Sequence, residues 1–331
     1  MAVELYEVFF RDGSYVLDFG FTKEQMRTVG AAMEMAGFRH VEVGHGYGLG
    51  AARAGYPAAA ESDETYLKTA SRVFKNCAFG PFFIPNVGSD DDIAMAADCG
   101  AKFISVGNNI TQIESAQESV AKAKSLGLET TVCLMKAYVL AEKEFRQKVK
   151  IVQSWEPDYI TIMDSAGNMT PDETASRVAV INEEGGSRPG FHGHDNLSLA
   201  AANAMTAVKN GAVRIDSSIG GLGRSGGNAA TEMLAALFQK ENFSSKPSLD
   251  DLEPVMEAVR KAKVELPYAK DFTDILLGLY GLHSSIAKSL NDAAKRHGVK
   301  RAVLYEQVAA VNRVNPAEEE IDGIAKRMSA K

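Results

Sequence analysis

The chain has 331 residues, 45% of them hydrophobic, and its 36 Lys and Arg against 43 Asp and Glu give a formal net charge of −7. This length and hydrophobic content suffice for a large buried core, whereas the acidic balance argues against nucleic-acid binding, which needs a basic face. No apolar run reaches the roughly 18 residues of a membrane span, residues 1–14 lack a signal-peptide pattern, and the three cysteines have no CxxC spacing, so we expect a cytoplasmic protein that contacts no membrane.

Short β-branched or apolar runs alternate with amphipathic helical patterns over about the first 240 residues. The predicted strands are residues 5–10, 40–44, 78–84, 102–107, 130–135, 159–164, 189–194 and 213–218. The predicted helices between them include residues 22–37, 62–74, 90–100, 113–127, 141–155, 171–185 and 198–211. Several of these begin with Thr, Ser or Asp and end at Gly, as capped helices do. Eight successive β-then-α units predict a (β/α)8 TIM barrel. A doubly wound open sheet is the competing interpretation, but the chain has no Gly-rich nucleotide turn of the required spacing.

After about Lys240 the pattern becomes entirely helical, with predicted helices at residues 248–264, 272–298, 301–312 and 317–330 and no further strand. We therefore divide the chain into a barrel of residues 1–244 and a helical C-terminal domain of residues 245–331. The second domain is expected to pack on or near the barrel mouth.

Polar side chains follow several predicted strands at their carboxyl ends, where barrels of this class carry their chemistry. His192 and His194 are two residues apart on a strand, so they project from the same face. With Asp12 they form a set of two imidazoles and one carboxylate, which suits a divalent ion such as Mn²⁺, Mg²⁺, Co²⁺ or Zn²⁺. The alternative, surface or hydrogen-bonded core histidines, is less favoured because three of the six histidines, including His45, end strands on this face.

Three further features at the strand ends permit two interpretations each. Arg11 could stabilise an enolate beside a metal ion, or it could form a rim ion pair with Asp12. The Gly-rich residues 220–228 could be a flexible loop or could offer backbone N–H groups to an anion. Lys136 most simply forms a salt bridge with a rim acid, but it could instead bind an anionic arm of a substrate; a Schiff base is disfavoured beside a metal.

The segments "RDGS" at residues 11–14, "FHGHDN" at 191–196, "GGNAATE" at 226–232 and "GLYGLHSSI" at 278–286 carry a family resemblance. The chain resembles the DRE-TIM metallolyases, the group of HMG-CoA lyase and isopropylmalate synthase, and within it the 4-hydroxy-2-oxovalerate aldolases. This resemblance implies a class II aldolase, usually with Mn²⁺, that cleaves a 4-hydroxy-2-oxo acid into the pyruvate enolate and an aldehyde, or forms the same bond. A Claisen-type acyl-CoA synthase or lyase on the same scaffold is the alternative, and a catalytically silent scaffold barrel is a third hypothesis.

The resemblance also implies roles for individual residues. Asp12, His192 and His194 would bind the metal, and Asn228 would be a possible further ligand. A 2-oxo acid would chelate the ion, with Arg11 on its enolate oxygen. Substrate-binding residues would be Ser165, which helps to hold the carboxylate, His45 and Lys136.

Two positions that differ from the family concern the proton transfer. The aldolases have a histidine base after RDGS and a tyrosine before the Ser-Ser pair of the C-terminal region, whereas this chain has Tyr15 and His283. A histidine with a pKa near ~6.5 is a better base at neutral pH than a tyrosine near ~10. We therefore assign the base to His283 and a hydrogen-bonding or acid role to Tyr15. The alternative is that neither is catalytic and that the chain has another reaction.

Other differences concern the ligands and partners. Tyr47 and Phe82 stand where the aldolases carry other pocket residues, which indicates an aldehyde different from theirs. The family pairs with an acylating aldehyde dehydrogenase, but residues 311–331 depart from the usual ending, so self-association is the favoured expectation. The expected ligands are a small 2-oxo acid and an aldehyde.

Overall fold

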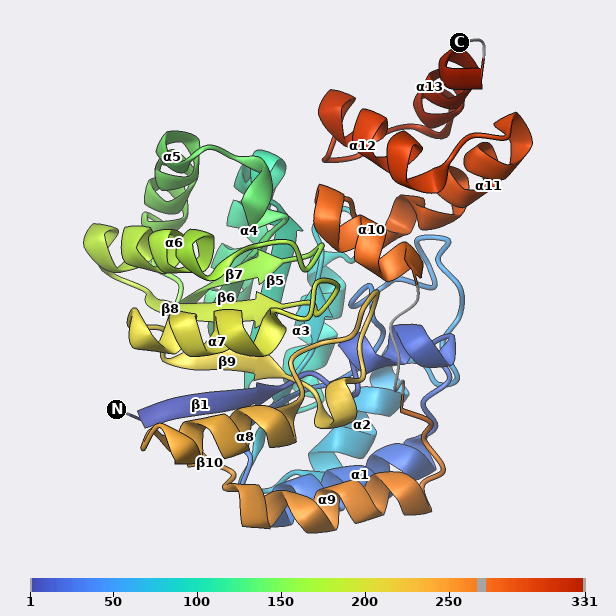
Figure 1. Ribbon diagram of the computed structural model, residues 1–331. Coiled ribbons are helices and arrows are strands. Elements are labelled where there is room, and N and C mark those ends of the chain that lie inside the picture. The colour runs from blue at the N-terminus through green and yellow to red at the C-terminus, as the bar shows by residue number, and fades with distance from the viewer. Residues whose placement is uncertain (1, 267–271, 330–331) are drawn as a thin grey trace.

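A computed structural model describes residues 2–266 and 272–329 of the chain. In the described residues, nine strands of a ten-stranded parallel sheet follow the order β3-β2-β1-β9-β8-β7-β6-β5-β4, and the tenth, a short strand at Ser244–Lys246, pairs with β1 beside this path. Their bounds are β1 Ala2–Glu7, β2 His40–Glu42, β3 Ala78–Gly80, β4 Phe82–Phe83, β5 Phe103–Asn109, β6 Glu129–Met135, β7 Tyr159–Asp164, β8 Arg188–Gly193 and β9 Arg214–Ser217. Helices surround this nearly closed sheet (Figure 1), so the predicted (β/α)8 barrel is confirmed.

The predicted strand at residues 78–84 is divided at Pro81 into β3 and β4. Proline has no N–H to donate to a sheet ladder, so β3 pairs with β2 while β4 pairs with β5. The backbone nevertheless remains between its neighbours, because the amide of Ser105 donates to the carbonyl of Pro81 at 3.1 Å. These contacts bring the two ends of the sheet together and give the equivalent of eight barrel strands.

Capping residues mark the ends of several barrel helices. Thr22 and Gln25 form a reciprocal capping box at the start of α1, and Gly37 ends that helix in the left-handed conformation at φ 81°. Thr170 caps α6 in the same way, with Pro171 in its first turn. The helix bounds are α1 Lys23–Ala36, α2 Asp63–Val73, α3 Asp90–Asp98, α4 Gln117–Ser125, α5 Glu142–Gln153, α6 Pro171–Glu184, α7 Ala200–Lys209 and α8 Thr231–Lys240.

The chain after Lys240 differs from its prediction in one element. The expectation of no further strand was wrong, because β10 (Ser244–Lys246) pairs in parallel with the first residues of β1. Helix α9 (Leu249–Lys261) then packs beside α1 (Figure 1), and its Leu252, Val255 and Val259 belong to the barrel's hydrophobic core. We therefore propose that the domain boundary follows α9 rather than residue 244.

The C-terminal helices have a hydrophobic core of their own. They are α10 Phe272–Tyr280, α11 Ala287–His297, α12 Arg301–Val311 and α13 Glu318–Ser329. Leu277, Leu290, Leu304 and Ile321 are buried together in this second cluster. In Figure 1 these helices (orange to red) stand beyond the carboxyl ends of the barrel strands, where the functional residues lie.

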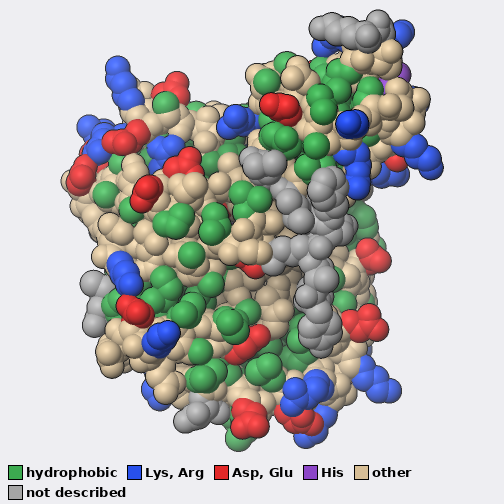
Figure 2. All heavy atoms as spheres, in the orientation of Figure 1, with side chains coloured by type: hydrophobic (Ala, Val, Ile, Leu, Met, Phe, Trp, Pro, Cys, Tyr) green, Lys and Arg blue, Asp and Glu red, His purple; other side chains and the backbone are tan. Residues whose placement is uncertain are grey.

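The surface carries mixed charge on the face that Figure 2 shows, with Lys and Arg interspersed among Asp and Glu. No helix in the described part of the chain is long and apolar enough to cross a membrane.

Candidate active site

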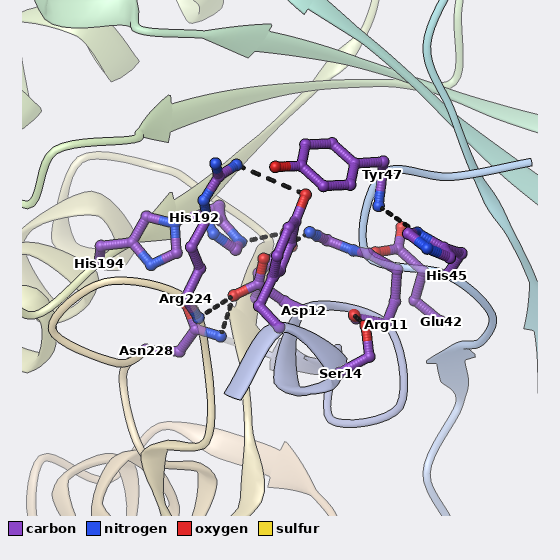
Figure 3. Close-up of polar contacts among 12 residues, drawn as sticks. Arg11, Asp12, Ser14, Glu42, His45, Tyr47, His192, His194, Arg224 and Asn228 are labelled. Carbon is purple, nitrogen blue, oxygen red and sulfur yellow. Dashed lines mark hydrogen bonds and ion pairs between the residues drawn. The ribbon is translucent and has the colours of Figure 1, made fainter. Parts of the chain in front are cut away.

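Three predicted ligand residues meet at the carboxyl ends of the strands. Asp12 opens the 3₁₀ turn that follows β1, His192 lies in β8, and His194 directly follows that strand. All three are buried, and one ligand atom from each lies within 4.8 Å of the others. Figure 3 shows Asp12 between the two imidazole rings on one side and Arg11 on the other.

Hydrogen bonds fix the orientation of both imidazoles. His192 Nδ1 lies 3.1 Å from Asp216 Oδ2, and His194 Nδ1 lies 3.2 Å from the carbonyl of Gly227. Both partners are acceptors, so each Nδ1 carries the proton and each Nε2 keeps its lone pair. An acceptor behind the ring is the usual support for a metal-binding histidine.

Two buried acceptors beside Asp12 have no partner among the described residues, and they test whether the site fits a metal. His192 Nε2 and the Asn228 side-chain oxygen are both unpaired, although buried polar atoms are normally satisfied. Asn228 reaches the cluster because it bridges to His194 across the sheet end and its amide donates to Asp12 Oδ2 at 2.8 Å. Unpaired nitrogen and oxygen acceptors beside a carboxylate fit a divalent cation.

Arg11 is held in place by two carboxylates. Its Nη1 donates to Asp12 Oδ1 at 2.6 Å, and its Nε donates to Glu42 Oε2 at 2.5 Å. The guanidinium also lies over the ring of Phe82, at 4.6 Å from the ring centre. These contacts confine a permanent positive charge to one place beside the cluster.

The protonation states also suit a cation site. Burial alone would raise the pKa of Asp12, but Arg11 and the two histidines hold it well below its usual range. Burial lowers the pKa of His194 to about 4, which keeps this imidazole neutral at pH 7. An ionised carboxylate and a neutral imidazole are the forms that bind metals.

The exchanged pair of the sequence prediction lies in the same cavity as these groups. A cavity of about 290 Å³ is lined by Tyr15 and His283 together with Arg11, Asp12 and His194. Tyr15 belongs to the turn after β1, whereas His283 precedes α11 in the C-terminal region. The structure therefore brings together two residues that are 268 positions apart.

Each member of this pair has a defined neighbour. Arg224 Nη1 donates to the hydroxyl of Tyr15 at 3.4 Å, and burial raises the pKa of Tyr15 well above its usual range. His283 Nδ1 lies 3.0 Å from Ser285 Oγ and accepts from the Ser285 amide at 3.3 Å. Burial, Arg224 and Lys136 lower the pKa of His283 well below its usual value, so its ring is neutral at pH 7.

The three predicted substrate-binding residues have different positions. Ser165 and Lys136 line the cavity, and the Lys136 amide donates to Ser165 Oγ at 3.0 Å. His45 stacks on Phe19, and both of its nitrogens bond to backbone groups, at Tyr47 and Pro57. The substrate contact expected for His45 does not fit this position, because neither nitrogen is free to bind a ligand.

The prediction that Lys136 forms a salt bridge was wrong for the described part of the chain. Its amine donates to the backbone carbonyl of Val314, in the connection between α12 and α13, and no described carboxylate pairs with it. Burial, followed by the charge of Arg224, lowers the pKa of Lys136 to about 8.

Sequence reasoning missed three residues that support the site: Glu42, Asp216 and Arg224. Glu42 and Asp216 each stand at an interior position of a predicted strand, directly after an apolar residue. A carboxylate at such a position must have a partner, and that signal could have found them. Arg224 lies among glycines, which predicted a flexible loop and gave no indication that the Arg224 side chain contacts the site.

Comparison with known proteins confirms the family resemblance. The chain belongs to the HMGL-like family, whose sequence pattern matches residues 2–259. Within this family it is a carbon–carbon lyase, similar along nearly its whole length to proteins named 4-hydroxy-2-oxovalerate aldolase. The protein of that name from Carboxydothermus hydrogenoformans is 32% identical over 319 residues, 96% of this chain and 95% of the relative. That from Moorella thermoacetica is 30% identical over 330 residues, 100% of this chain and 98% of the relative.

Solved structures show the same fold at lower identity. Bacillus subtilis HMG-CoA lyase is 17% identical, with a TM-score of 0.67 over 81% of this chain and 96% of that one. The carboxyl transferase domain of Rhizobium etli pyruvate carboxylase is 16% identical, with a TM-score of 0.71 over 99% of this chain and 60% of that one.

Proposed function

We propose that this protein is a divalent-metal-dependent class II aldolase that cleaves or forms a 4-hydroxy-2-oxo acid, with pyruvate enolate and an aldehyde as its two halves. The observation that carries the proposal is the buried cluster of Asp12, His192 and His194 beside Arg11, with unpaired acceptors on His192 and Asn228. The names of the full-length relatives support the reaction class.

The cation would be held by Asp12 and the Nε2 atoms of His192 and His194, with the Asn228 oxygen as a further ligand. When bound, a divalent cation supplies Lewis-acid stabilisation of the negative charge that develops on a keto oxygen. Mn²⁺ is the ion we favour, by family resemblance. Nitrogen and oxygen ligands without thiolate also accommodate Mg²⁺, Co²⁺ or Zn²⁺.

Arg11 and Ser165 would orient the 2-oxo acid. Glu42 fixes the Arg11 guanidinium, so its charge is already directed when the enolate oxygen develops and no reorganisation is needed. Ser165 Oγ accepts the Lys136 amide, which leaves the hydroxyl proton of Ser165 for the carboxylate of the 2-oxo acid.

His283 would take the proton of the 4-hydroxyl group during cleavage. In the structure Nδ1 accepts the Ser285 amide, so Nε2 carries the proton of the neutral ring. Accepting the 4-hydroxyl proton at Nε2 requires the other tautomer, in which Nδ1–H donates to Ser285 Oγ. Tyr15, whose raised pKa keeps its phenol protonated, would donate a hydrogen bond to the same oxygen region. The low pKa of His283 limits its strength as a base, so we expect its ring to pass the proton on to C3 of the enolate, which gives pyruvate and balances the proton taken from the 4-hydroxyl group.

Self-association stays a prediction; we favour it over an acylating aldehyde dehydrogenase partner because residues 311–331 depart from the usual ending of the family.

The test is a cleavage assay with 4-hydroxy-2-oxopentanoate, read as pyruvate release before and after chelation and after return of Mn²⁺. We expect chelation to abolish turnover and Mn²⁺ to restore it. His192→Ala should lose metal binding and activity, whereas the control His297→Ala, a histidine of α11 that pairs with Asp322, should keep both. Activity unaffected by chelation would refute the metal role, and thiol release from acetyl-CoA with a 2-oxo acid would favour the Claisen-type alternative.

A further inference from the structure

The cavity contains more positive charge than the proposed reaction requires. Among the described residues, its lining carries the cations Arg11, Lys136 and Arg224 but a single carboxylate, Asp12. Arg11 is paired with Asp12 and Glu42. Pyruvate has one carboxylate, and Ser165 and the proposed cation site are sufficient to bind it.

The charged side chains of Lys136 and Arg224 have only neutral hydrogen-bond partners among the described residues. The Lys136 amine contacts the Val314 carbonyl, and the Arg224 guanidinium contacts the hydroxyls of Ser284 and Tyr15. Among the side chains that the structure describes, no carboxylate forms a salt bridge with the amine of Lys136 or the guanidinium of Arg224. Lys136 is only 5% exposed, and an ammonium group buried in this way is costly unless an anion pairs with it.

The position of Lys136 is also unusual for a residue with a side chain. It directly follows β6 and has the left-handed conformation at φ 57°, which is uncommon outside glycine and asparagine and is often kept at functional sites. Both Lys136 and Arg224 lie close enough to His283 for their charges to lower its pKa. The two cations therefore share the part of the cavity that holds the proposed base.

We propose that Lys136 and Arg224 form a second anion subsite, and that the substrate carries a carboxylate or phosphate on its aldehyde half as well as the carboxylate of its 2-oxo acid half. This inference rests on the proposed function, because it assumes that a 2-oxo acid occupies the cation site. An anion at this subsite would pair with both cations and would reduce their repulsion of a protonated His283.

The test compares inert ligands that differ only at their far end. 2-Oxoadipate and 2-oxohexanoate share the 2-oxo acid group and chain length, but the first ends in a carboxylate and the second in a methyl group. Neither has a 4-hydroxyl to cleave, so calorimetry on the Mn²⁺-loaded protein measures binding alone; 2-oxoglutarate and 2-oxopentanoate form a shorter pair. We expect the diacids to bind at least about tenfold more tightly, as a charged hydrogen bond predicts.

Variants of Lys136 test whether this residue causes the tighter binding of the diacids. In Lys136→Met the ratio of the two dissociation constants should fall toward one, whereas Lys136→Arg should keep most of it. Lys209→Met, which removes an exposed lysine of α7 paired with Glu241, controls for the change in net charge. If Lys136→Met does not fold, as circular dichroism would show, the wild-type ligand pairs still decide the proposal.

The outcomes separate the two proposals. Equal binding of diacid and monoacid to the wild type overturns the second subsite and leaves the aldolase proposal standing. Equal weakening of both ligands in Lys136→Met means that the lysine binds the first carboxylate, which also overturns the subsite. Binding of neither ligand refutes the proposed function, and the subsite with it.

Aldol addition of pyruvate then distinguishes the two anions. Glycolaldehyde phosphate and succinic semialdehyde represent the phosphate and the carboxylate, with glycolaldehyde and butyraldehyde as the neutral counterparts. A preference for either anionic aldehyde supports the subsite and names its ligand, whereas a preference for the neutral ones overturns it.

Discussion

At the residue scale, hydrogen bonds from neighbouring groups fix the orientation of the side chains in the candidate site. Asp216 and the Gly227 carbonyl fix the tautomers of His192 and His194, and Glu42 fixes Arg11. The sequence indicates which residues carry the chemistry. The unprotonated Nε2 atoms of the two histidines and the fixed guanidinium of Arg11 depend on hydrogen-bond partners from distant parts of the chain, which the sequence alone does not identify.

The exchanged pair Tyr15 and His283 provides the residue-scale prediction. We expect His283→Ala to lower kcat of cleavage by about 10² to 10⁴-fold, the usual contribution of a general base. Tyr15→Phe should lower it much less, because it removes one hydrogen-bond donor and keeps the packing of the ring against Tyr47. Steady-state kinetics of pyruvate release measures both.

His297→Ala is the matched control for removal of a histidine from the C-terminal helices. A larger loss in Tyr15→Phe than in His283→Ala would assign the base to the tyrosine and would reverse our proposal.

At the element scale, the barrel closes where glycine lets two strands approach. A Cβ atom at Gly80, the last residue of β3, would lie 2.2 Å from the carbonyl oxygen of Phe103 and 2.6 Å from its ring. The two ends of the sheet meet beside Pro81 through this close approach of Gly80 to Phe103. The barrel can therefore close only if residue 80 has no side chain.

Gly80→Ala is therefore expected to destabilise the fold by ~1–3 kcal/mol or more, as overpacking does. Gly323→Ala is the matched control, because Gly323 lies inside α13 and a Cβ atom there would lie 3.6 Å from its nearest neighbour, the flexible end of the Arg327 side chain. This control should be neutral or stabilising by up to ~1 kcal/mol. Midpoints of chemical denaturation give both values, and equal midpoints for Gly80→Ala and the wild type would contradict the closure argument.

At the scale of the whole molecule, a buried acid couples stability to pH. Glu7, at the end of β1, is fully buried and accepts hydrogen bonds from Phe9, Ile219 and Thr231. Burial raises the pKa of Glu7 to about 8. Because its folded pKa lies above its unfolded value, the folded state binds the proton more tightly, and the associated stability is lost as the pH rises.

We expect the free energy of unfolding to fall by about 1.4 kcal/mol per pH unit between roughly pH 5 and 8 from this group alone. Glu7→Gln keeps the shape without the titration, so its stability should exceed that of the wild type increasingly toward pH 8. Denaturation series at several pH values measure the difference. Glu24→Gln, an exposed change in α1, should run parallel to the wild type, and parallel curves for Glu7→Gln as well would refute the assignment.

Local sequence patterns were enough to predict the barrel, the order of most of its elements and the meeting of the candidate metal ligands Asp12, His192 and His194. Periodicity and capping are local properties, and the rule that chemistry lies at the carboxyl ends of strands converts strand positions into shared positions in space. That reasoning placed Asp12 with His192 and His194 across 180 residues of chain.

Only the tertiary structure decided which polar groups pair. Whether Lys136 bonds a carboxylate or the Val314 carbonyl, whether His45 has a free nitrogen, and whether α9 packs on the barrel all depend on how helices and loops from distant parts of the chain fill the space above and around the strands. A displacement smaller than one side chain is enough to change the partner of a hydrogen bond. Sequence patterns specify only the helix or strand in which a residue lies, which is not precise enough to identify that partner.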